Sequence, residues 1–508
     1  MRSLNKFLQL NKEGINTFET DAQGCIYIPE EITVENIFSD IVRYITAKAI
    51  SDKAKIRVVR LVNGDDSKEK RKISDSFGFN TINVRIKGIR GILNQIKACV
   101  KTTLLFFGCK TGEALLQYRI GKIPIGQYIY DKIIREQERN TIDTISILQD
   151  FKNIYEGIYL YYNLKNIYRD QAPKFIIMNE MAYFLNIYRV LGQQKGAKVI
   201  RASVLLRQED SNDMYGFIHE SYRYMATGKL NVANQMDYNT YVLEYFKRYL
   251  QGESELSWIK SIVADQKKTE FNEAINSMQL DAHKKTVFIM AHSLSDAPHS
   301  SSKMLFRDYY TALRETIKIA SRIDNVNWVL KVHPSYKSYL GTNGRELIDC
   351  YGKKNIVLFD ERYSNEIVFK LADAIITVQG TIGIEASSLG IPVVVTGKAW
   401  YTGFGFTINA FSMERYEKIL SGLYKVKRLS NEKRDIARKV FCAYLLGYSE
   451  SKIDKDKLGK TIFDIISDKS IKNKNETTLQ KLCEYMESKS IENSYIYQRS
   501  LDFVKKNN

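Results

Sequence analysis

The sequence predicts two α/β domains, each with a doubly wound parallel sheet, followed by C-terminal helices. Three observations support this fold class. The chain has 508 residues, which is too long for a single ordinary hydrophobic core. Short apolar runs alternate with segments of helical periodicity in both halves. A polar, helical segment lies between the two series of runs, so we expect them to belong to different domains.

The first series of predicted strands lies in residues 1–265, the expected N-terminal domain. From residue 132 to 168 the pattern is that of a long amphipathic helix, whose stripe of Ile147, Leu148, Phe151, Ile154, Ile158 and Tyr161 is interpreted as core-facing. The strands are expected at KIRVVRLVNGDD (55–66), NTINVRI (80–86), TTLLFFG (102–108), KFIIMNE (174–180) and AKVIRASV (197–204).

The second series follows a predicted linker at residues 266–285 and defines a second domain at residues 286–430. Helical periodicity continues through residues 431–508, which we expect to form helices that pack back on the domains. The predicted strands of the second domain are TVFIMAHS (286–293), NWVLKVHP (327–334), NIVLFD (355–360), DAIITVQG (373–380) and IPVVVTG (391–397).

The net charge of +18 favours anionic partners such as nucleic acid, a phospholipid surface or acidic and phosphorylated sugars. The Lys and Arg residues are dispersed, without the basic block or aromatic motif of a nucleic-acid module, so nucleic acid is not expected as a partner. No apolar run reaches the roughly 20 residues that span a bilayer, and the N-terminus lacks a secretory signal. We expect a cytoplasmic protein, and its charge is compatible with peripheral association with the inner face of the membrane.

Metal and cofactor sites are not predicted. The six cysteines are widely spaced and include no CxxC pair, which argues against a zinc site and a disulfide scaffold. No DxD follows a strand in an exposed loop, and no pair of histidines has ligand spacing. No cofactor is expected.

Polar residues follow the predicted strands of the second domain, where open α/β sheets bind their ligands. Asp296 and His299 follow the first of these strands, and a carboxylate and an imidazole on one loop suit acid/base catalysis. Lys331 and His333 follow the second strand, and His333 is the third predicted catalytic residue. The alternatives are an Asp/Pro turn for the first pair and a hydrogen-bonded structural histidine for His333.

The segment Gln379-Gly380-Thr381-Ile382-Gly383 is the predicted phosphate site. Glycines permit close approach of the backbone, and a helix that begins at Thr381 offers free N–H groups and a hydroxyl to an anion. Alternatively, Thr381 caps the helix and Gly383 permits close packing, which is compatible with phosphate binding. The segment lacks the full GxGxxG and the lysine of a P-loop, so neither NAD nor ATP is implied.

The remaining predicted contacts are less specific. Glu385 lies one helical turn after Thr381, where it can reach a ribose hydroxyl or support the turn. Gly397, at the end of the last strand, is assigned with Glu385 to the nucleotide. Asp131, Arg135 and Glu180 are the candidate site residues in the first domain, with surface helix charges or caps as the alternative.

Four segments of the second half, taken in their order along the chain, resemble the bacterial capsule polysaccharide biosynthesis family, which includes Kdo transferases. IGQYIYD (125–131) is similar to the N-terminal half of that family, so the resemblance extends over most of the chain to about residue 430. The four segments are SDAPH (295–299), NWVLKVHPS (327–335), QGTIGIEASSLGIPVVVTG (379–397) and KAWYTGFG (398–405).

The resemblance implies a GT-B glycosyltransferase, with two Rossmann-like domains facing a cleft, that uses a nucleotide-activated sugar without a metal. By similarity, His333 and Thr381 contact the nucleotide phosphate, Glu385 lies near the nucleotide, and the donor is CMP-linked Kdo or a related acidic sugar. Gly380-Thr381 stands where many relatives carry Ser-Thr, which leaves the donor open. The implied acceptor is a capsule or surface saccharide, free or lipid-linked. The resemblance places it on the first domain (residues 1–265), which makes Asp131, Arg135 and Glu180 the acceptor-side candidates.

Two other functions remain open at this point. A polyol-phosphate transferase of the teichoic-acid type also pairs a His-Pro motif with a Ser/Thr turn in a two-domain fold. A non-catalytic subunit of capsule assembly would bind a nucleotide sugar or a polysaccharide without consuming the donor.

Overall fold

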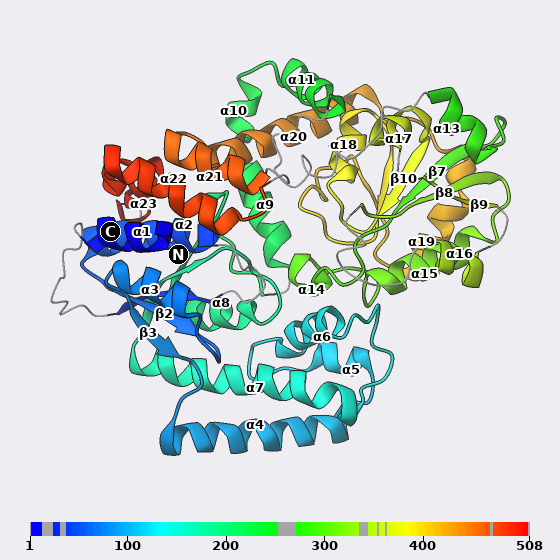
Figure 1. Ribbon diagram of the computed structural model, residues 1–508. Helices are drawn as coiled ribbons and strands as arrows, with labels where there is room; N and C mark the ends of the chain where they lie inside the picture. Colours follow the sequence, from blue (N-terminus) through cyan, green and yellow to red (C-terminus); the bar gives the residue numbers. More distant parts are fainter. Residues whose placement is uncertain are drawn as a thin grey trace. The chain divides into compact units, whose positions relative to one another are not determined.

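The computed structural model describes residues 2–12, 24–30, 37–214, 216–251, 271–334, 344–352, 355–360, 363–467 and 471–505. The chain divides into two compact units (Figure 1). The first unit comprises Met1–Gly108, Ser146–Asn212 and Glu450–Asn508. The second unit comprises Cys109–Ile145 and Asp213–Ser449.

The first unit contains a six-stranded sheet with the order β3-β2-β1-β4-β5-β6. All neighbouring strands are parallel except β5 and β6, which are antiparallel. The chain winds outward in both directions from β1 and β4, which is the strand order of a doubly wound Rossmann sheet. The strands are β1 (Cys25–Pro29), β2 (Arg57–Val62), β3 (Asn80–Asn83), β4 (Pro173–Met178), β5 (Lys198–Ala202) and β6 (Leu206–Glu209).

Helices from both ends of the chain cover the first sheet. The central helix α2 contacts β1, β2, β4 and β5 and also packs on α23, while α1 packs on α22. The core of this unit therefore joins apolar side chains from the first and last segments of the chain. The helices are α1 (Arg2–Lys12), α2 (Ile37–Ala54), α3 (Lys68–Ser76), α4 (Gly88–Gly108), α7 (Ile147–Asp170), α8 (Leu185–Gln193), α21 (Lys457–Ser467), α22 (Lys474–Ser488), η3 (Ile491–Asn493) and α23 (Tyr495–Lys505).

The second unit contains a parallel six-stranded sheet with the order β12-β11-β10-β7-β8-β9. Its strand order is again that of a doubly wound sheet, and the winding direction changes between β7 and β10. The central strands are continuous apolar runs because both faces of the sheet are covered. The strands are β7 (Lys285–Met290), β8 (Val326–Lys331), β9 (Ile356–Leu358), β10 (Ala374–Thr377), β11 (Val393–Val395) and β12 (Ile408–Asn409).

Helices from both chain segments of this unit accompany the second sheet. The last of them, α20, ends two residues after Ser449, the last residue of the unit. They are α5 (Gly112–Gln117), α6 (Ile125–Glu136), α9 (Phe217–Thr227), α10 (Leu230–Asn234), α11 (Tyr238–Leu250), α13 (Phe271–Met278), α14 (Pro298–Ser301), α15 (Tyr309–Ala320), α16 (Gly344–Tyr351), α17 (Asn365–Leu371), α18 (Ile382–Ser388), α19 (Met413–Ser421), η2 (Leu423–Lys425) and α20 (Asn431–Ser451).

The predicted fold class, two doubly wound α/β domains followed by C-terminal helices, is confirmed. Most predicted strands are present, while β1, β6 and the two-residue β12 were not predicted. The cleft between the domains stays a prediction. Among the described helices, none combines the length and the apolar character needed to cross a membrane.

The division into units differs from the predicted boundaries, because contacts distant in sequence decide it. Residues 109–145 belong with the second sheet, where α6 packs on α14. Residues 213–251 also belong there, and the Tyr245 hydroxyl on α11 donates to Glu385 on α18 at 3.1 Å. Residues 266–270 of the predicted linker lie outside the described residues, while the rest of it contains α13 and the first residue of β7.

Residues 102–108, predicted as a strand, are the last two turns of α4. Their apolar side chains continue the helical register that begins at Gly88, and a short apolar run does not by itself distinguish a strand from a helix. The stripe of α7 is also divided. Ile154 and Ile158 are buried as expected, but Ile147 and Leu148 are 61% and 97% exposed.

Replacing Gly126 with alanine is expected to destabilise the second unit by about 3 kcal/mol. A Cβ at this position of α6 would lie 1.8 Å from the carbonyl oxygen of Leu115 on α5, so the two helices would have to separate. Denaturant unfolding of the full chain measures the effect. Gly108→Ala is the matched control, since a Cβ there meets nothing within 4 Å. Equal stabilities of the two variants would contradict this account.

Candidate functional site

A cavity of about 140 Å³ lies at the carboxyl ends of β7, β8 and β10 in the second unit. This position adjoins the point between β7 and β10 where the winding of the sheet reverses, and open α/β sheets bind their ligands at such points. Five predicted site residues line the cavity together: Lys331, His333, Gly380, Thr381 and Glu385. The structure therefore brings together side chains that are up to 54 positions apart in the sequence.

Lys331 supplies positive charge to the wall of this cavity. Its side chain is nearly buried, with 4% of the residue exposed. The ammonium nitrogen lies 3.3 Å from the carbonyl oxygen of Tyr363 and 4.4 Å from the centre of the Phe359 ring. The carbonyl accepts a hydrogen bond from the ammonium group, and an aromatic ring attracts a cation. An anion in the cavity would therefore meet a positioned cation.

The two histidines of the cavity are neutral near pH 7. Burial, together with the charge of Lys331, lowers the pKa of His333 to about 4. Burial lowers the pKa of His292 to about 3, with a smaller contribution from His333. The Nδ1 atom of His333 is 3.0 Å from Ser293 Oγ, and His292 Nε2 accepts the N–H of Gln379 at 3.2 Å.

Glu385 is a buried carboxyl group at the cavity wall. Only 2% of the residue is exposed, and its Oε1 atom accepts a hydrogen bond from the Tyr245 hydroxyl. Burial raises the pKa of Glu385 to about 7, although the Tyr245 hydrogen bond opposes the shift. The group therefore changes charge within the physiological pH range.

The turn before α18 serves packing as well as the cavity. Thr381 lines the cavity and its side chain makes no capping hydrogen bond, which differs from the capping alternative. Gly383 permits close packing, because a Cβ there would lie 2.1 Å from the Tyr401 hydroxyl oxygen. That hydroxyl donates to the carbonyl oxygen of Gly380 at 2.6 Å. Because α18 has only seven residues, we assign the anion contact chiefly to Lys331.

Gln379 and Gly397 have structural contacts that the sequence did not indicate. The Gln379 side chain is buried and hydrogen-bonded to Tyr309 and Ser302. A Cβ on Gly397 would lie 2.9 Å from the carbonyl oxygen of Val378, so the glycine allows two strand ends to approach. Neither residue lines the cavity, because both face the packed interior.

Asp131 and His299 form a buried ion pair within the second unit. The Asp131 side chain is fully buried, and its Oδ1 atom is 2.6 Å from His299 Nδ1. His299 Nε2 lies 2.8 Å from the carbonyl oxygen of Arg307, so both ring nitrogens face acceptors and both donate. Burial opposes the imidazolium, but the Asp131 carboxylate outweighs it and raises the pKa of His299.

The ion pair changes the interpretation of both residues. Asp131 and Arg135, predicted on the acceptor-side domain, lie on α6 in the second unit. Because both nitrogens of His299 are engaged, we assign it to positioning rather than to proton transfer. Glu180 follows β4 in the first unit and is half-buried.

Asp296 is exposed on the loop between β7 and α14. Its backbone N–H donates to the carbonyl oxygen of Ser293 at 3.2 Å, and Ser293 Oγ in turn contacts His333. The next residue, Ala297, has φ of 41°, a left-handed conformation that is uncommon for a residue with a side chain. The anchored His299 follows two residues after Ala297, so the loop that carries Asp296 is held at both ends.

Sequence reasoning missed several residues around this cavity. His292 lies at the end of a predicted strand (286–293), which was a usable signal, whereas Tyr249 and Asn365 line the cavity from helices with no distinguishing pattern. Asn365 donates to the Tyr249 hydroxyl at 2.7 Å. His219, outside the predicted second domain, accepts the N–H of Trp400 at 3.0 Å. Only the folded chain brings these residues to the second sheet.

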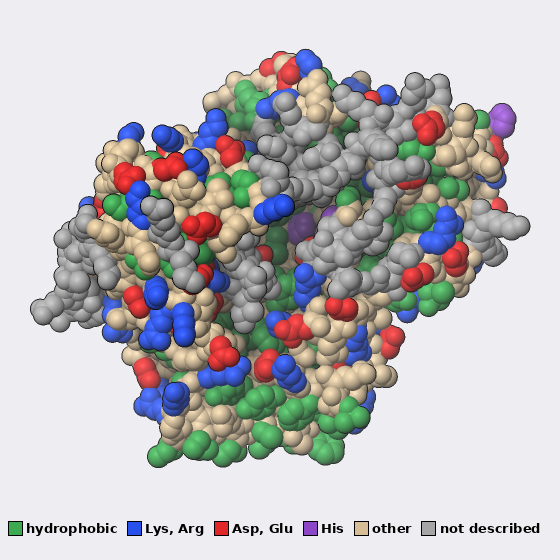
Figure 2. Space-filling model, in the orientation of Figure 1, with side chains coloured by type: hydrophobic (Ala, Val, Ile, Leu, Met, Phe, Trp, Pro, Cys, Tyr) green, Lys and Arg blue, Asp and Glu red, His purple; other side chains and the backbone are tan. Residues whose placement is uncertain are grey.

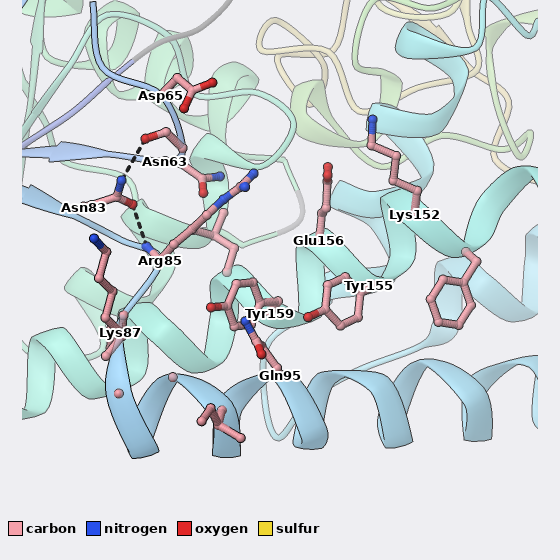
Figure 3. A pocket seen from close by; sticks show the side chains of 17 residues that line it. Asn63, Asp65, Asn83, Arg85, Lys87, Gln95, Lys152, Tyr155, Glu156 and Tyr159 are labelled. Atoms are coloured by element: carbon pink, nitrogen blue, oxygen red, sulfur yellow. Dashed lines mark hydrogen bonds between the residues drawn. The ribbon is translucent and has the colours of Figure 1, made fainter.

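A second cavity, of about 780 Å³, lies in the first unit beyond β2 and β3. Figure 3 shows Tyr155 and Tyr159 of α7 facing the space that Arg85 enters from the segment after β3. Phe151, Tyr155 and Tyr159 stack in sequence along α7, with ring centres 6.1 and 5.7 Å apart. Cations, amides and aromatic rings in one concave surface suit a polar ligand with apolar faces.

No group of three or more His, Cys, Asp or Glu side chains is arranged to hold a metal ion within the described part of the chain.

Residues 180–426 match the family described as capsule polysaccharide biosynthesis protein, which confirms the resemblance found in the sequence. No curated protein sequence matches the chain significantly.

Three solved structures illustrate the similar folds. KpsC of Thermosulfurimonas dismutans, a β-Kdo 2,4 transferase, is 12% identical, covers 52% of this chain and 79% of its own, and gives a TM-score of 0.32. A glycosyltransferase from Rickettsia africae ESF-5 is 11% identical, covers 95% of this chain and 99% of its own, and gives a TM-score of 0.28. Anabaena Alr3699/HepE, in complex with UDP and glucose, is 12% identical, covers 87% of this chain and 98% of its own, and gives a TM-score of 0.27.

Asp131→Asn is expected to lower the free energy of unfolding by about 3 kcal/mol at about pH 6, because buried His299 loses its charged partner. The raised pKa of His299 means that the pair stabilises fully below the unfolded pKa of 6.5 and less as pH rises through the folded pKa. The deficit should therefore shrink by about pH 9. Denaturant unfolding at both pH values measures it.

Asp143→Asn is the control for this experiment. Its carboxylate pairs with Arg307, but 68% of the Asp143 side chain is exposed, so the expected loss is below about 1 kcal/mol. A deficit for Asp131→Asn that does not change with pH would contradict the charged pair.

Glu385→Gln is expected to change how stability depends on pH. The folded pKa of about 7 exceeds the ordinary glutamate value of 4.5, so protonated Glu385 favours folding. That contribution is lost as pH rises from about 4.5 through 7. Across this pH window the free energy of unfolding of wild type should fall by about 3 kcal/mol, and that of the variant should not. The measurement is the difference in unfolding free energy between the two proteins at about pH 5 and pH 8.

Glu366→Gln, on the surface of α17, provides the matched control, because 41% of that side chain is exposed. If Glu385→Gln and Glu366→Gln gave the same pH dependence, the buried carboxyl would not titrate near neutrality.

Proposed function

Residues 180–426 match the capsule polysaccharide biosynthesis family, and on that premise we propose that the chain is a glycosyltransferase. It moves a sugar from a nucleotide-activated donor to a capsule or surface-saccharide acceptor. The observation that carries the proposal is the convergence of Lys331, His333, Thr381 and Glu385 on one cavity at the switch point of the second sheet. CMP-linked Kdo is the first donor to test, because the family resemblance suggests it.

In the proposed reaction, the donor phosphate lies against Lys331. The acceptor hydroxyl attacks the anomeric carbon, a new carbon–oxygen bond forms, and the bond from that carbon to the phosphate oxygen breaks. Negative charge develops on the departing phosphate, and a fixed ammonium group in a buried site stabilises it without reorganisation. The neutral His333, hydrogen-bonded to Ser293, offers a further polar contact to the phosphate.

We propose that Asp296 is the general base that accepts the proton of the acceptor hydroxyl. This carboxylate is exposed, as a base that meets an incoming acceptor must be, and its loop is connected to His333 through Ser293. The Asp131–His299 pair anchors the same loop three residues later. A group held within hydrogen-bond reach of a reacting hydroxyl contributes roughly 10²- to 10⁴-fold to the rate.

We further propose that the cavity of the first unit binds the saccharide acceptor. The rings of Tyr155 and Tyr159 suit the apolar faces of a sugar, and Arg85, Lys87 and Lys152 suit carboxylate or phosphate groups on it. Asp65, Glu156 and the amides of Asn63 and Asn83 add hydrogen-bonding partners for hydroxyl groups.

Calorimetric titration with CMP, CDP, UDP and GDP, with a chelator present, tests the donor site. Wild type should bind one of them, and Lys331→Met should weaken that binding about thirtyfold through loss of a charge-assisted contact. Lys418→Met, an exposed lysine of the same unit, should bind as wild type does. If no nucleotide binds, or if the two variants behave alike, the phosphate assignment is wrong.

A transfer assay with an acidic-saccharide acceptor distinguishes the proposal from its alternatives. Asp296→Asn should lower kcat about a hundredfold without changing nucleotide affinity. Arg85→Gln should raise KM for the acceptor alone. Donor that binds but is never consumed would identify a binding subunit, and a product that carries a polyol phosphate would identify a transferase of the teichoic-acid type. Activity that is lost on chelation and restored by a metal would contradict metal-independent transfer.

A further inference from the structure

Helix α4 presents a continuous apolar face to solvent. Seven large apolar residues on it are exposed, from 47% at Leu93 to 79% at Ile89. Figure 2 shows hydrophobic side chains gathered along the helix at the lower edge of the view. A soluble surface seldom exposes so many large apolar residues in one place. The seven are Ile89, Ile92, Leu93, Ile96, Val100, Leu104 and Phe107.

The opposite face of α4 is packed in the first unit, so the exposed face is a separate surface of a folded helix. Gly91, Asn94 and Ala98 are buried among the residues that pack on α7. The Asn94 amide donates to Asn163 on α7 at 2.8 Å. The seven exposed residues recur at spacings of three and four, which places them on one side of the helix.

The apolar face continues onto the start of α7. Ile147 and Leu148 are 61% and 97% exposed, and they precede Phe151 by one helical turn. Phe151 stacks on Phe106 of α4 with ring centres 6.1 Å apart, so these residues lie beside the C-terminal end of α4.

Positive charge borders this face. Between residues 85 and 110 every charged residue is basic, and Arg90, Lys97 and Lys101 recur along one edge of the helix. Arg90 pairs with Asp170 at 2.7 Å, whereas no ion pair of Lys97 or Lys101 occurs among the described residues. A helix with one apolar face and lysines along its edge is typical of segments that lie in a membrane interface.

We propose that α4 docks the protein on an anionic phospholipid surface, with its apolar face among the headgroups and upper acyl chains. The helix of 21 residues would lie along the surface for about 31 Å and insert about 5–10 Å deep. Lys97 and Lys101 would face the lipid phosphates. This inference does not depend on the proposed transfer reaction, since it concerns another surface and another partner.

Charge favours lipid over a second copy of the chain as the occupant. A symmetric dimer through this face would bring the basic residues of one α4 against those of the other, and like charges at an interface cost several kcal/mol. Lysine is also depleted in protein interfaces. An anionic bilayer complements both the charge and the apolar face.

Flotation of the full-length protein with vesicles tests the proposal. Wild type should bind phosphatidylcholine vesicles that contain phosphatidylglycerol and should bind pure phosphatidylcholine much more weakly. Ile96→Gln/Val100→Gln/Leu104→Gln should weaken binding about a hundredfold, because it removes the inserted apolar side chains. Lys97→Gln/Lys101→Gln should weaken binding to anionic vesicles about thirtyfold, and added salt should remove the difference.

Two matched controls carry the same number of substitutions on exposed residues of the second unit. Val232→Gln/Leu243→Gln/Phe411→Gln and Lys418→Gln/Lys427→Gln should both bind vesicles as wild type does. The proposal is overturned if wild type does not float with anionic vesicles, or if the α4 variants bind as tightly as the controls. An α4 variant that turns a wild-type oligomer into a monomer, with no vesicle binding by either, would assign the face to a second copy instead.

Discussion

The buried ion pair of Asp131 and His299 is the constraint on which the second unit depends. The pair joins α6 to the segment that precedes α15. In the sequence, α6 lies between two segments of the first unit. Removing one partner of a buried pair leaves an uncompensated charge, so the two segments stabilise the unit only when they meet. Tyr130, next to Asp131, reinforces the junction by donating to buried Asp308 at 2.5 Å. The junction also anchors the loop that carries Asp296, so the packing of α6 affects the position of a proposed catalytic group.

Burial determines the charge state of the donor cavity. The same desolvation that keeps His292 and His333 neutral raises the pKa of Glu385 towards neutrality. Lys331 keeps a carbonyl and an aromatic ring as neighbours. The proposed donor site therefore combines one cation with two neutral histidines and a carboxyl group that titrates near neutrality. A phosphate can bind there without several buried cations repelling one another.

The first unit presents two surfaces of different chemistry on α4. Gly88, Gly91 and Gln95 border the larger cavity, whereas Ile96, Val100 and Leu104 face solvent. Ile92 belongs to both surfaces. If both proposals hold, an acceptor with a lipid anchor would find its saccharide site next to the membrane-docking face.

The sequence by itself determined the two doubly wound domains, because the buried strands of a parallel sheet are short apolar runs. It also determined which polar residues lie together, because parallel strands end at a common edge of the sheet. These residues are Lys331, His333, Gly380, Thr381 and Glu385. It did not determine the division of the chain, the contacts of Asp131 with His299, or the presence of Tyr249 and Asn365 at the cavity. Those features depend on pairs that lie far apart in sequence, and periodicity reports only which side of an element is apolar. Residues 102–108 illustrate the same limit: an apolar run satisfies a buried strand and an exposed helix face equally, and only tertiary packing decided that α4 leaves this face in solvent.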